Sequence, residues 1–223
     1  MNRPTDNAGE PATGAPSDPG NTLASGPPAL RRADRADIPV LAAMLARAFI
    51  DDPIAEWACR PDSLRESMLE RFYTTYARQL LPHEEVWISA ERTSAALWTP
   101  PERWKLSALK DAQLSRCLLH PRLIFRLPLI AVGLYGLERK HPVAPPHWYL
   151  AFLGTDPSAQ GQGLGSAIMR PVLEQCDSDG VAAYLESSKE RNIDFYARHG
   201  FRVIRELRLP RGPRVWPMWR EPR

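Results

Sequence analysis

Cysteine is scarce in this chain, and the few cysteines are not arranged as a recognisable site. Cys59, Cys117 and Cys176 lie far apart among 223 residues, and none belongs to a C-x-x-C pair. This spacing argues against a disulfide framework and against a zinc site, and it favours a reducing compartment. We therefore expect three packed thiols, no metal and a cytoplasmic location.

The chain also lacks an apolar stretch long enough to span a bilayer. Its most apolar segment, LIFRLPLIAVGLYGL (123–137), is shorter than the roughly 20 residues that a spanning helix needs, and Arg126 and Pro128 interrupt it. This segment could be a buried helix or the apolar wall of a ligand pocket. We expect a buried helix with a partial role in the pocket, and no membrane association.

Aromatic residues are missing from the first 28 positions, which are rich in Pro, Gly, Ser, Thr and Asn. Such a segment has too little apolar surface to offset the entropy lost on ordering. It also has no apolar region of the kind found in secretory signals. We expect a disordered tail over 1–28 and a single domain over 29–223.

Neither sign of charge dominates, because 29 Lys and Arg stand against 26 Asp and Glu, for a net charge of +3. Five late arginines are spaced by three residues: Arg202, Arg205, Arg208, Arg211 and Arg214. On a strand this spacing places successive side chains on opposite faces, so they do not form one basic patch. We expect no nucleic-acid partner.

The most informative feature present is a glycine-rich turn, Gln160-Gly161-Gln162-Gly163-Leu164-Gly165. It follows the apolar run 147–155 and precedes the helical pattern 166–175. Glycine lets backbone N–H groups approach a ligand closely, and a helix N-terminus favours negative charge, so the turn suits a phosphate. It does not fit G-x-G-x-x-G, because Ser166 and Ile168 occupy the required sixth positions, and the chain contains no G-x-x-x-x-G-K-[ST] loop.

A second motif lies downstream in NIDFYARHGF (192–201). Its pattern predicts a short helix that carries Asn192 and Tyr196 and ends at Gly200, before a strand that begins at Phe201.

Together these motifs resemble the GNAT superfamily of N-acetyltransferases, and they are most similar to the puromycin N-acetyltransferase type. The resemblance is carried by residues 147–169 and 184–201 and by the tail motif LPRGPRVW (209–216), with weaker similarity over 31–53 and 95–102. It covers most of the chain from about Leu30. The insert between Trp98 and His147 departs from the puromycin type, so puromycin is not carried over as the substrate.

The resemblance implies an α/β GNAT fold, with a mixed, mainly antiparallel twisted sheet and helices on both faces. It also implies direct transfer of an acetyl group from acetyl-CoA to a primary amine of a small molecule or peptide, by a monomer or homodimer. The alternative is a non-catalytic acyl-CoA-binding or sensing module. The presence of both Tyr196 and Glu186 favours the enzyme.

By the same resemblance, backbone groups near the end of the 147–155 strand hold pantetheine, and the amides of the glycine turn hold the pyrophosphate. Gln160 stands where many relatives have arginine. The implied acetyl-CoA-binding residues are Leu153, Gly154, Thr155, Gln160, Gly161, Gln162, Gly163, Leu164, Gly165, Ser166, Asn192 and Tyr196.

Two catalytic residues are implied. Tyr196 matches the tyrosine that donates a proton to the departing sulfur, and an ordinary pKa of about 10 keeps a phenol protonated at neutral pH. Glu186, in the predicted strand 182–188, matches the family glutamate. It could remove a proton from the amine, or it could only position the amine.

The predicted acceptor-binding residues are Asp51, Asp52, Trp98 and Glu186. Two adjacent acids after a helix suit a cationic amine, but they suit a solvated helix end slightly better. Trp98 is a pocket wall or, more safely, a core residue. The five histidines show no metal-ligand spacing.

The remaining elements follow from caps and periodicity. Asp37 is expected to cap a helix over 40–49, and Ser63 with Glu66 is expected to open a second helix with an apolar stripe. Segments 86–89 and 95–98 predict a hairpin. Residues 105–140 should be mostly helical, with breaks near Pro121 and Pro128.

Overall fold

The computed structural model describes residues 28–59, 62–83, 85–105, 108–117 and 121–223. The predicted tail over 1–28 lies outside the described residues, except for its last position.

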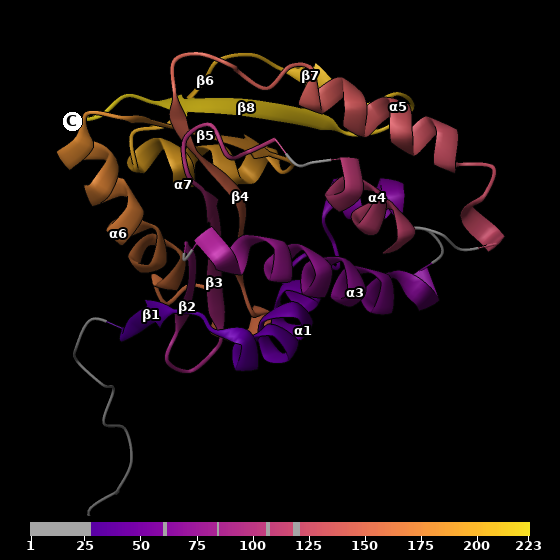
Figure 1. Cartoon of the computed structure of the whole chain (residues 1–223), viewed down its shortest axis with the longest axis horizontal. Coiled ribbons are helices and arrows are strands. Elements are labelled where there is room, and N and C mark those ends of the chain that lie inside the picture. Colours follow the sequence, from indigo (N-terminus) through magenta and orange to yellow (C-terminus); the bar gives the residue numbers. More distant parts are fainter. Residues whose placement is uncertain (1–27, 60–61, 84, 106–107, 118–120) are drawn as a thin grey trace, which may run out of the picture.

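The described strands form one eight-stranded sheet. The helices are arranged around this sheet (Figure 1). The strand order is β1-β2-β3-β4-β5-β8-β6, and β7 pairs with β8 off this path. Among the described strands, only β4 and β5 pair in parallel, so the sheet is mixed and mainly antiparallel, as expected. The strands are β1 (Leu30–Arg32), β2 (Val86–Ser89), β3 (Ser94–Thr99), β4 (His147–Thr155), β5 (Ala182–Ser187), β6 (Arg202–Val203), β7 (Leu207–Arg208) and β8 (Arg214–Arg220).

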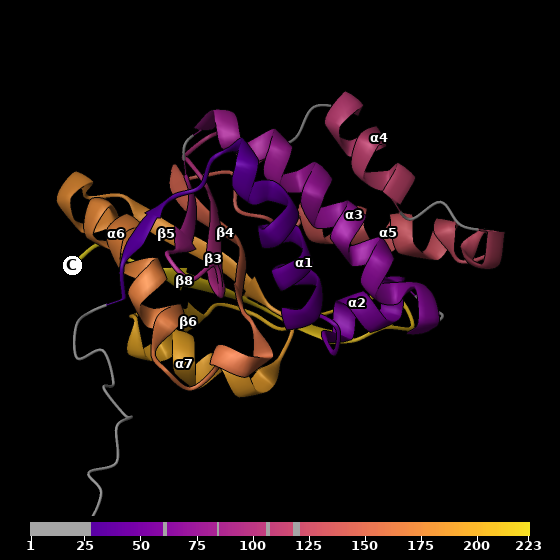
Figure 2. The ribbon, with the colours of Figure 1, turned by 90° about the horizontal axis from the view of Figure 1, so that it is seen from below.

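Helices cover both faces of the sheet. Seen from below, α6 lies on one side of β3, β4 and β5, and α1 and α3 lie on the other (Figure 2). The helices are α1 (Ile38–Ala48), α2 (Pro53–Ala58), α3 (Asp62–Leu80), α4 (Ala108–Cys117), α5 (Leu127–Glu138), α6 (Leu164–Asp179) and α7 (Ile193–Arg198).

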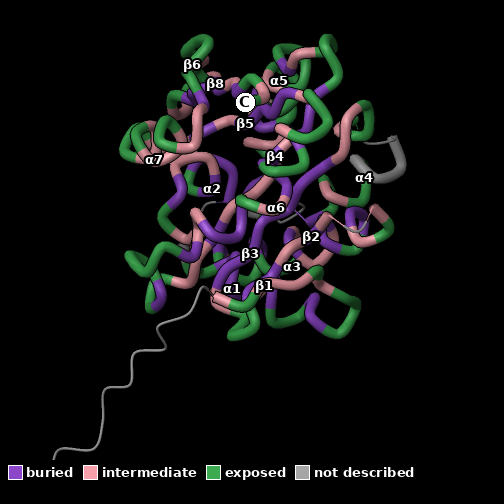
Figure 3. The backbone as a smooth tube through the Cα atoms, turned by 90° about the vertical axis from the view of Figure 1, so that its left-hand side faces the viewer, coloured by how far each residue is buried: buried purple, intermediate pink, exposed green. Residues whose placement is uncertain are grey.

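Strand alternation divides the core between the two faces. Ala95 and Leu97 of β3 belong to the core beneath α1 and α3, whereas Ala96 and Trp98 belong to the core beneath α6. β3 and β5 are buried along most of their length, whereas β4 is only partly buried beyond Leu150 (Figure 3). The hairpin of β2 and β3 is confirmed.

The start of α1 differs from the prediction in its chemistry. Asp37 does occupy the N-cap, but its carboxylate makes no cap hydrogen bond to this helix. It pairs instead with the guanidinium of Arg31, at 2.5 and 2.6 Å, and accepts a hydrogen bond from the Asp34 amide. Asp34 caps the preceding 3-10 turn in a reciprocal capping box with Asp37. Aspartate at this position therefore ties the first strand to the first helix.

The predicted capping box at Ser63 and Glu66 is wrong in position. Helix α3 already begins at Asp62, so Ser63 lies inside its first turn. The predicted apolar stripe is confirmed, because Met68, Leu69 and Tyr76 are buried.

The short helix α2, which the sequence analysis did not predict, opens with Asp52 at its N-cap and Pro53 in its first turn.

The prediction of a buried helix over 123–137 is wrong. Helix α5 begins at Leu127 with Pro128 in its first turn, so this proline opens the helix instead of breaking it. Phe125 is 95% exposed, and Val132 and Tyr135 are also exposed. None of the helices within the described ranges is long and apolar enough to cross a membrane.

All three cysteines are free and buried, as predicted. Burial raises the pKa of Cys59 to about 11 and that of Cys176 to about 12. Both thiols are therefore un-ionised at neutral pH, and neither is poised as a nucleophile.

Candidate functional site

The site begins where the two parallel strands separate. β4 and β5 pair from His147 with Ala182 up to Leu150 with Leu185. Beyond this point β4 continues to pair with β3, while β5 continues to pair with β8. A register shift between Leu97 and Trp98 of β3 leaves Ala151 of β4 as a bulge at the point of separation. The facing edges of the two strands thus diverge around a wedge-shaped opening.

The glycine turn closes one end of this opening. Gly161 and Gly163 have φ angles of 80° and 77°, a left-handed conformation that glycine adopts without strain. Gly163 is the N-cap of α6, so the helix begins two residues before the predicted pattern. A Cβ atom added at either glycine would meet nothing within 4 Å, so the space above these residues is open. This turn presents backbone amides and the positive end of a helix to the cleft.

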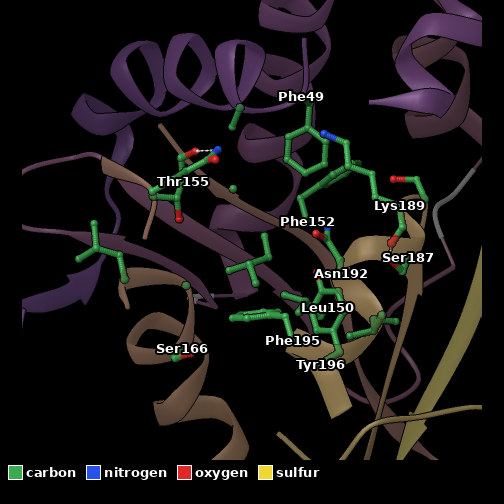
Figure 4. A pocket seen from close by; sticks show the side chains of 18 of the residues that line it. Phe49, Leu150, Phe152, Thr155, Ser166, Ser187, Lys189, Asn192, Phe195 and Tyr196 are labelled. Carbon is green, nitrogen blue, oxygen red and sulfur yellow. Dashed lines mark hydrogen bonds between the residues drawn. The ribbon is translucent and has the colours of Figure 1, made fainter. Parts of the chain in front are cut away.

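Together the strands, the turn and α7 enclose a cleft of about 540 Å³. In Figure 4, Phe195 and Tyr196 of α7 lie beside Leu150 of β4, with Ser166 of α6 on the same side and Phe49, the residue that follows α1, opposite. Gln160 donates a hydrogen bond to the Thr155 carbonyl at 3.2 Å, which fixes the turn against the end of β4.

Most of the predicted acetyl-CoA-binding residues lie together around this cleft. The lining includes Leu153, Gly154, Thr155, Gln160, Gly161, Gly163, Leu164, Gly165, Ser166, Asn192 and Tyr196. Gln162 is not among the lining residues. Gly154 has a packing reason to lack a side chain, because an added Cβ would lie 2.5 Å from Leu45 and 3.1 Å from Phe49.

Tyr196 lies on α7 at the point where the strands diverge. Its ring packs against Phe195 and Phe201, at centroid distances of 5.1 and 6.0 Å. Burial, and to a smaller extent the Asp52 carboxylate, raises the pKa of Tyr196 above its ordinary value. The phenol is therefore a proton donor across the neutral range.

Glu186 lies in the cleft wall, one residue beyond the last parallel pair. Its carboxylate accepts hydrogen bonds from the phenols of Tyr149, at 2.7 Å, and Tyr184, at 2.9 Å. These two bonds use both carboxylate oxygens and fix the orientation of the group.

The two adjacent acids have different surroundings. Asp51 is exposed and pairs with Lys189 at 2.6 Å and Arg191 at 3.2 Å, so its charge is already countered. The hydrogen bond from Lys189 is the main cause of its lowered pKa. Asp51 is not among the lining residues, and this environment fits the solvated alternative.

Asp52, in contrast, is 5% exposed and lines the cleft. One carboxylate oxygen caps α2 by accepting from the amides of Ile54 and Ala55, and the other accepts from the Ser188 hydroxyl. Burial raises its pKa, and these hydrogen bonds oppose that change. Asp52 therefore joins α2 to the segment after β5.

Trp98 does not reach the cleft. It is fully buried beneath α6 with Ala96, Trp148 and Ile168, because alternation along β3 points it to that face. The predicted role as a pocket wall is corrected to the core alternative.

The sequence analysis did not predict a pair of histidines beside Glu186. The Nε2 atoms of His141 and His147 are 3.0 Å apart, and Nδ1 of His141 lies 3.6 Å from Oε1 of Glu186. Strand alternation could have placed His147 and Tyr149 on one face of β4, beside Tyr184 and Glu186 on β5. His141 comes from the loop after α5, and no spacing in the sequence indicates its position.

A further contact that the sequence did not reveal joins α6 and α7. Nε2 of His199 lies 2.9 Å from the hydroxyl of Ser166, in the first turn of α6.

Within the described parts of the chain, no three His, Cys, Asp or Glu side chains gather as a metal site would require.

Comparison with known proteins agrees with this architecture. The model of the Acetyltransferase (GNAT) family matches residues 56–201 of the chain, well over half of its length. An uncharacterized N-acetyltransferase of Schizosaccharomyces pombe is 25% identical over 214 residues, covering 87% of this chain and 83% of the relative.

Solved structures share the fold at lower identity. A histone acetyltransferase HPA2 and related acetyltransferase from Corynebacterium glutamicum superposes with a TM-score of 0.63 at 23% identity, covering 89% of this chain and 98% of that one. A polyamine N-acetyltransferase of Drosophila melanogaster gives 0.55 at 17%, covering 86% and 98%. With the family match over residues 56–201, the diverging strands and the glycine turn, the chain belongs to the acetyltransferase (GNAT) family.

Proposed function

We propose that this protein transfers an acetyl group from acetyl-CoA directly to a primary amine of a small molecule or peptide. The observation that carries the proposal is one cleft that joins the open glycine turn, the diverging strand edges, the phenol of Tyr196 and the carboxylate of Glu186. Family membership supports acetyl transfer in general.

Acetyl-CoA would bind along the opening between β4 and β5. The amides from Gly161 to Ser166 would hold the pyrophosphate at the start of α6, where the helix dipole favours negative charge. Backbone groups of Leu153, Gly154 and Thr155 would hold the pantetheine arm, which then runs toward Leu150 and Tyr196.

Acetyl transfer then needs a neutral amine and a leaving group that accepts a proton. In this proposal Glu186 takes a proton from the ammonium of the acceptor, and the free amine nitrogen attacks the thioester carbon. When the C–S bond breaks, Tyr196 donates its proton to the thiolate, and the second proton lost by the nitrogen restores the phenol. The whole reaction yields an amide, free CoA and one released proton.

Asp52 supports a cationic acceptor, because its buried carboxylate lies in the same cleft as Glu186. The resemblance to the puromycin type stays a prediction, and puromycin belongs in an acceptor panel as one compound among polyamines, arylalkylamines and peptides.

The test is turnover with a panel of primary amines, followed both as release of the CoA thiol and as a mass increase of one acetyl group on the amine. The proposal expects amine-dependent thiol release, and a loss of about 100-fold or more in Glu186→Gln if this carboxylate is the base. Binding of acetyl-CoA without amine-dependent release across the panel would favour a sensing module instead. Lack of acetyl-CoA binding would refute both functions.

A further inference from the structure

The geometry points to His141 as the group that takes the amine proton from Glu186, with His147 fixing the tautomer that makes this transfer possible. This inference rests on the proposed function, since it concerns how the same site removes a proton from its acceptor.

The hydrogen bonds determine the tautomers. Nδ1 of His147 lies 2.8 Å from the Pro145 carbonyl, which can only accept, so this nitrogen carries the hydrogen. Burial is the main cause of a lowered pKa of His147, which keeps its ring neutral and leaves Nε2 as an acceptor. His141 must then donate from its own Nε2, 3.0 Å away.

This arrangement leaves the lone pair of His141 Nδ1 facing Glu186. The separation of 3.6 Å from Oε1 is longer than a hydrogen bond, so transfer needs a movement of roughly 0.5 Å. A ring in the other tautomer could not accept a proton from this carboxyl group. His147 therefore acts on His141 as an orienting residue acts on a general base.

The surroundings hold both rings in place and exclude water. His141 stacks on Trp104 at a centroid distance of 3.8 Å and meets the edges of Tyr149 and Tyr184 at 4.7 and 4.6 Å. Trp219 of β8 packs against His147. Other titratable groups act on the two phenols, namely Tyr76 of α3 on Tyr149 and Arg205 on Tyr184.

The chemistry explains why a second acceptor is useful. A carboxylate ordinarily has a pKa of about 4.3 and an imidazole about 6.5, so the imidazole holds a proton taken from an ammonium more firmly. The ammonium N–H bond breaks as the Glu186 O–H forms. That proton then passes to Nδ1 of His141, which restores the carboxylate beside an imidazolium. After the product leaves, the proton returns through Glu186 to water in the cleft.

The first test uses no turnover. Nuclear magnetic resonance of ¹⁵N-histidine-labelled protein follows the titration of His141 in wild type and in Glu186→Gln. Loss of the facing carboxylate should change the Nδ1 resonance of His141 and its dependence on pH, because the ring then faces a neutral amide instead of a charged group. The matched control is Glu190→Gln, which removes an exposed carboxylate paired with Arg214 elsewhere and should leave the titration in place. An unchanged His141 titration in Glu186→Gln would overturn the inference.

The second test is the pH dependence of kcat/KM for the best acceptor. Wild type should lose activity on the acidic side of its profile, and His141→Gln should move this limb to lower pH and lower the plateau by about 10- to 100-fold, because a carboxyl group is ordinarily a weaker base than an imidazole. Tyr149→Phe removes one hydrogen bond to Glu186 but keeps the imidazole, so its acidic limb should stay in place. A lower plateau in His141→Gln without any shift of the limb would mean a purely structural role.

The two tests distinguish failure of this inference from failure of the proposed function. If wild type acetylates no amine, the proposed function fails, and the resonance titration still decides whether Glu186 and His141 are coupled. If His141→Gln does not fold, the same titration in Glu186→Gln decides. If wild type acetylates an amine but Glu186 and His141 are not coupled, the inference is refuted and the proposed function stands.

Discussion

At the scale of single residues, the two catalytic groups that we propose have contrasting surroundings in the cleft. Glu186 is held by two phenols and faces an imidazole, whereas Tyr196 packs among aromatic rings. A carboxylate fixed by donors suits an acceptor of protons, and a phenol whose pKa is raised suits a donor. The residues implied by the resemblance thus have environments that match the roles we propose for them.

Tyr196→Phe tests the donor role. Removal of one hydroxyl should lower kcat by about 100-fold or more, because the thiolate would leave without a proton. The dissociation constant for acetyl-CoA should stay within about twofold, since the pyrophosphate contacts that we propose lie on α6 and the glycine turn. Steady-state kinetics and calorimetry measure the two quantities. A variant with near-wild-type kcat would remove Tyr196 from the mechanism.

His147 makes a prediction about stability and pH. Its folded pKa is lowered by burial, so below about pH 6.5 the unfolded chain binds more protons than the folded one. Its contribution to stability is therefore complete above that pH and is lost as the pH falls toward the folded pKa. Urea unfolding of wild type and His147→Gln at pH 7.5 and 5.5 measures this. Wild type should lose more stability than the variant on acidification. Equal losses of stability in the two proteins would contradict the lowered pKa of His147. The contributions of carboxyl groups are common to both proteins and therefore cancel in the comparison.

At the scale of elements, the sequence predicts best where local chemistry decides the structure. The β4 strand, the glycine turn and α7 follow from a continuous apolar run, from glycine at positive φ and from a C-terminal glycine, and each is predicted within about two residues. The resemblance added the roles of Tyr196 and Glu186, which residue patterns alone do not provide.

Predictions failed where tertiary context decides. An apolar segment predicts a buried helix only if something covers it, and the segment 123–137 leaves Phe125 and Val132 exposed. Asp37 could have capped a helix, but Arg31 offers its carboxylate a stronger charged partner. The contact of His141 with Glu186 joins a loop to a strand, and no local rule predicts such a contact.

Gly154→Ala tests the packing of α1 against β4. The added methyl group would lie 2.5 Å from Leu45 and 3.3 Å from Ala48, so we expect a loss of about 1–3 kcal/mol in the free energy of unfolding. Gly136→Ala is the matched control, because α5 leaves nothing within 4 Å of its added methyl group. That change should stabilise the protein by about 0.5–1 kcal/mol. Chemical denaturation compares the two, and equal effects would contradict the described packing.

At the scale of the whole molecule, the cleft lies between the half of the sheet that ends at β4 and the half that begins at β5. The parallel pairing of β4 with β5 joins the two halves at one end of the cleft. At the other end, Asp51 pairs with Lys189 and Arg191, and the Ser188 hydroxyl donates a hydrogen bond to Asp52. The loop between α1 and α2 is thereby tied to the segment between β5 and α7. A cleft joined at both ends is preorganised for an extended ligand, which lowers the ordering cost of binding.

The central claim is that the amides of the glycine turn bind the pyrophosphate of coenzyme A, and calorimetric titration with CoA tests it most directly. Gly163→Ala and Gly180→Ala place the same methyl group at left-handed positions at opposite ends of α6, with φ of 77° and 65° and nothing within 4 Å of either. Both should lose similar stability. Only Gly163→Ala, at the cleft, should weaken CoA binding, by about tenfold or more, while wild type and Gly180→Ala bind alike. No detectable binding by wild type, or equal affinity in the two variants, would contradict the account.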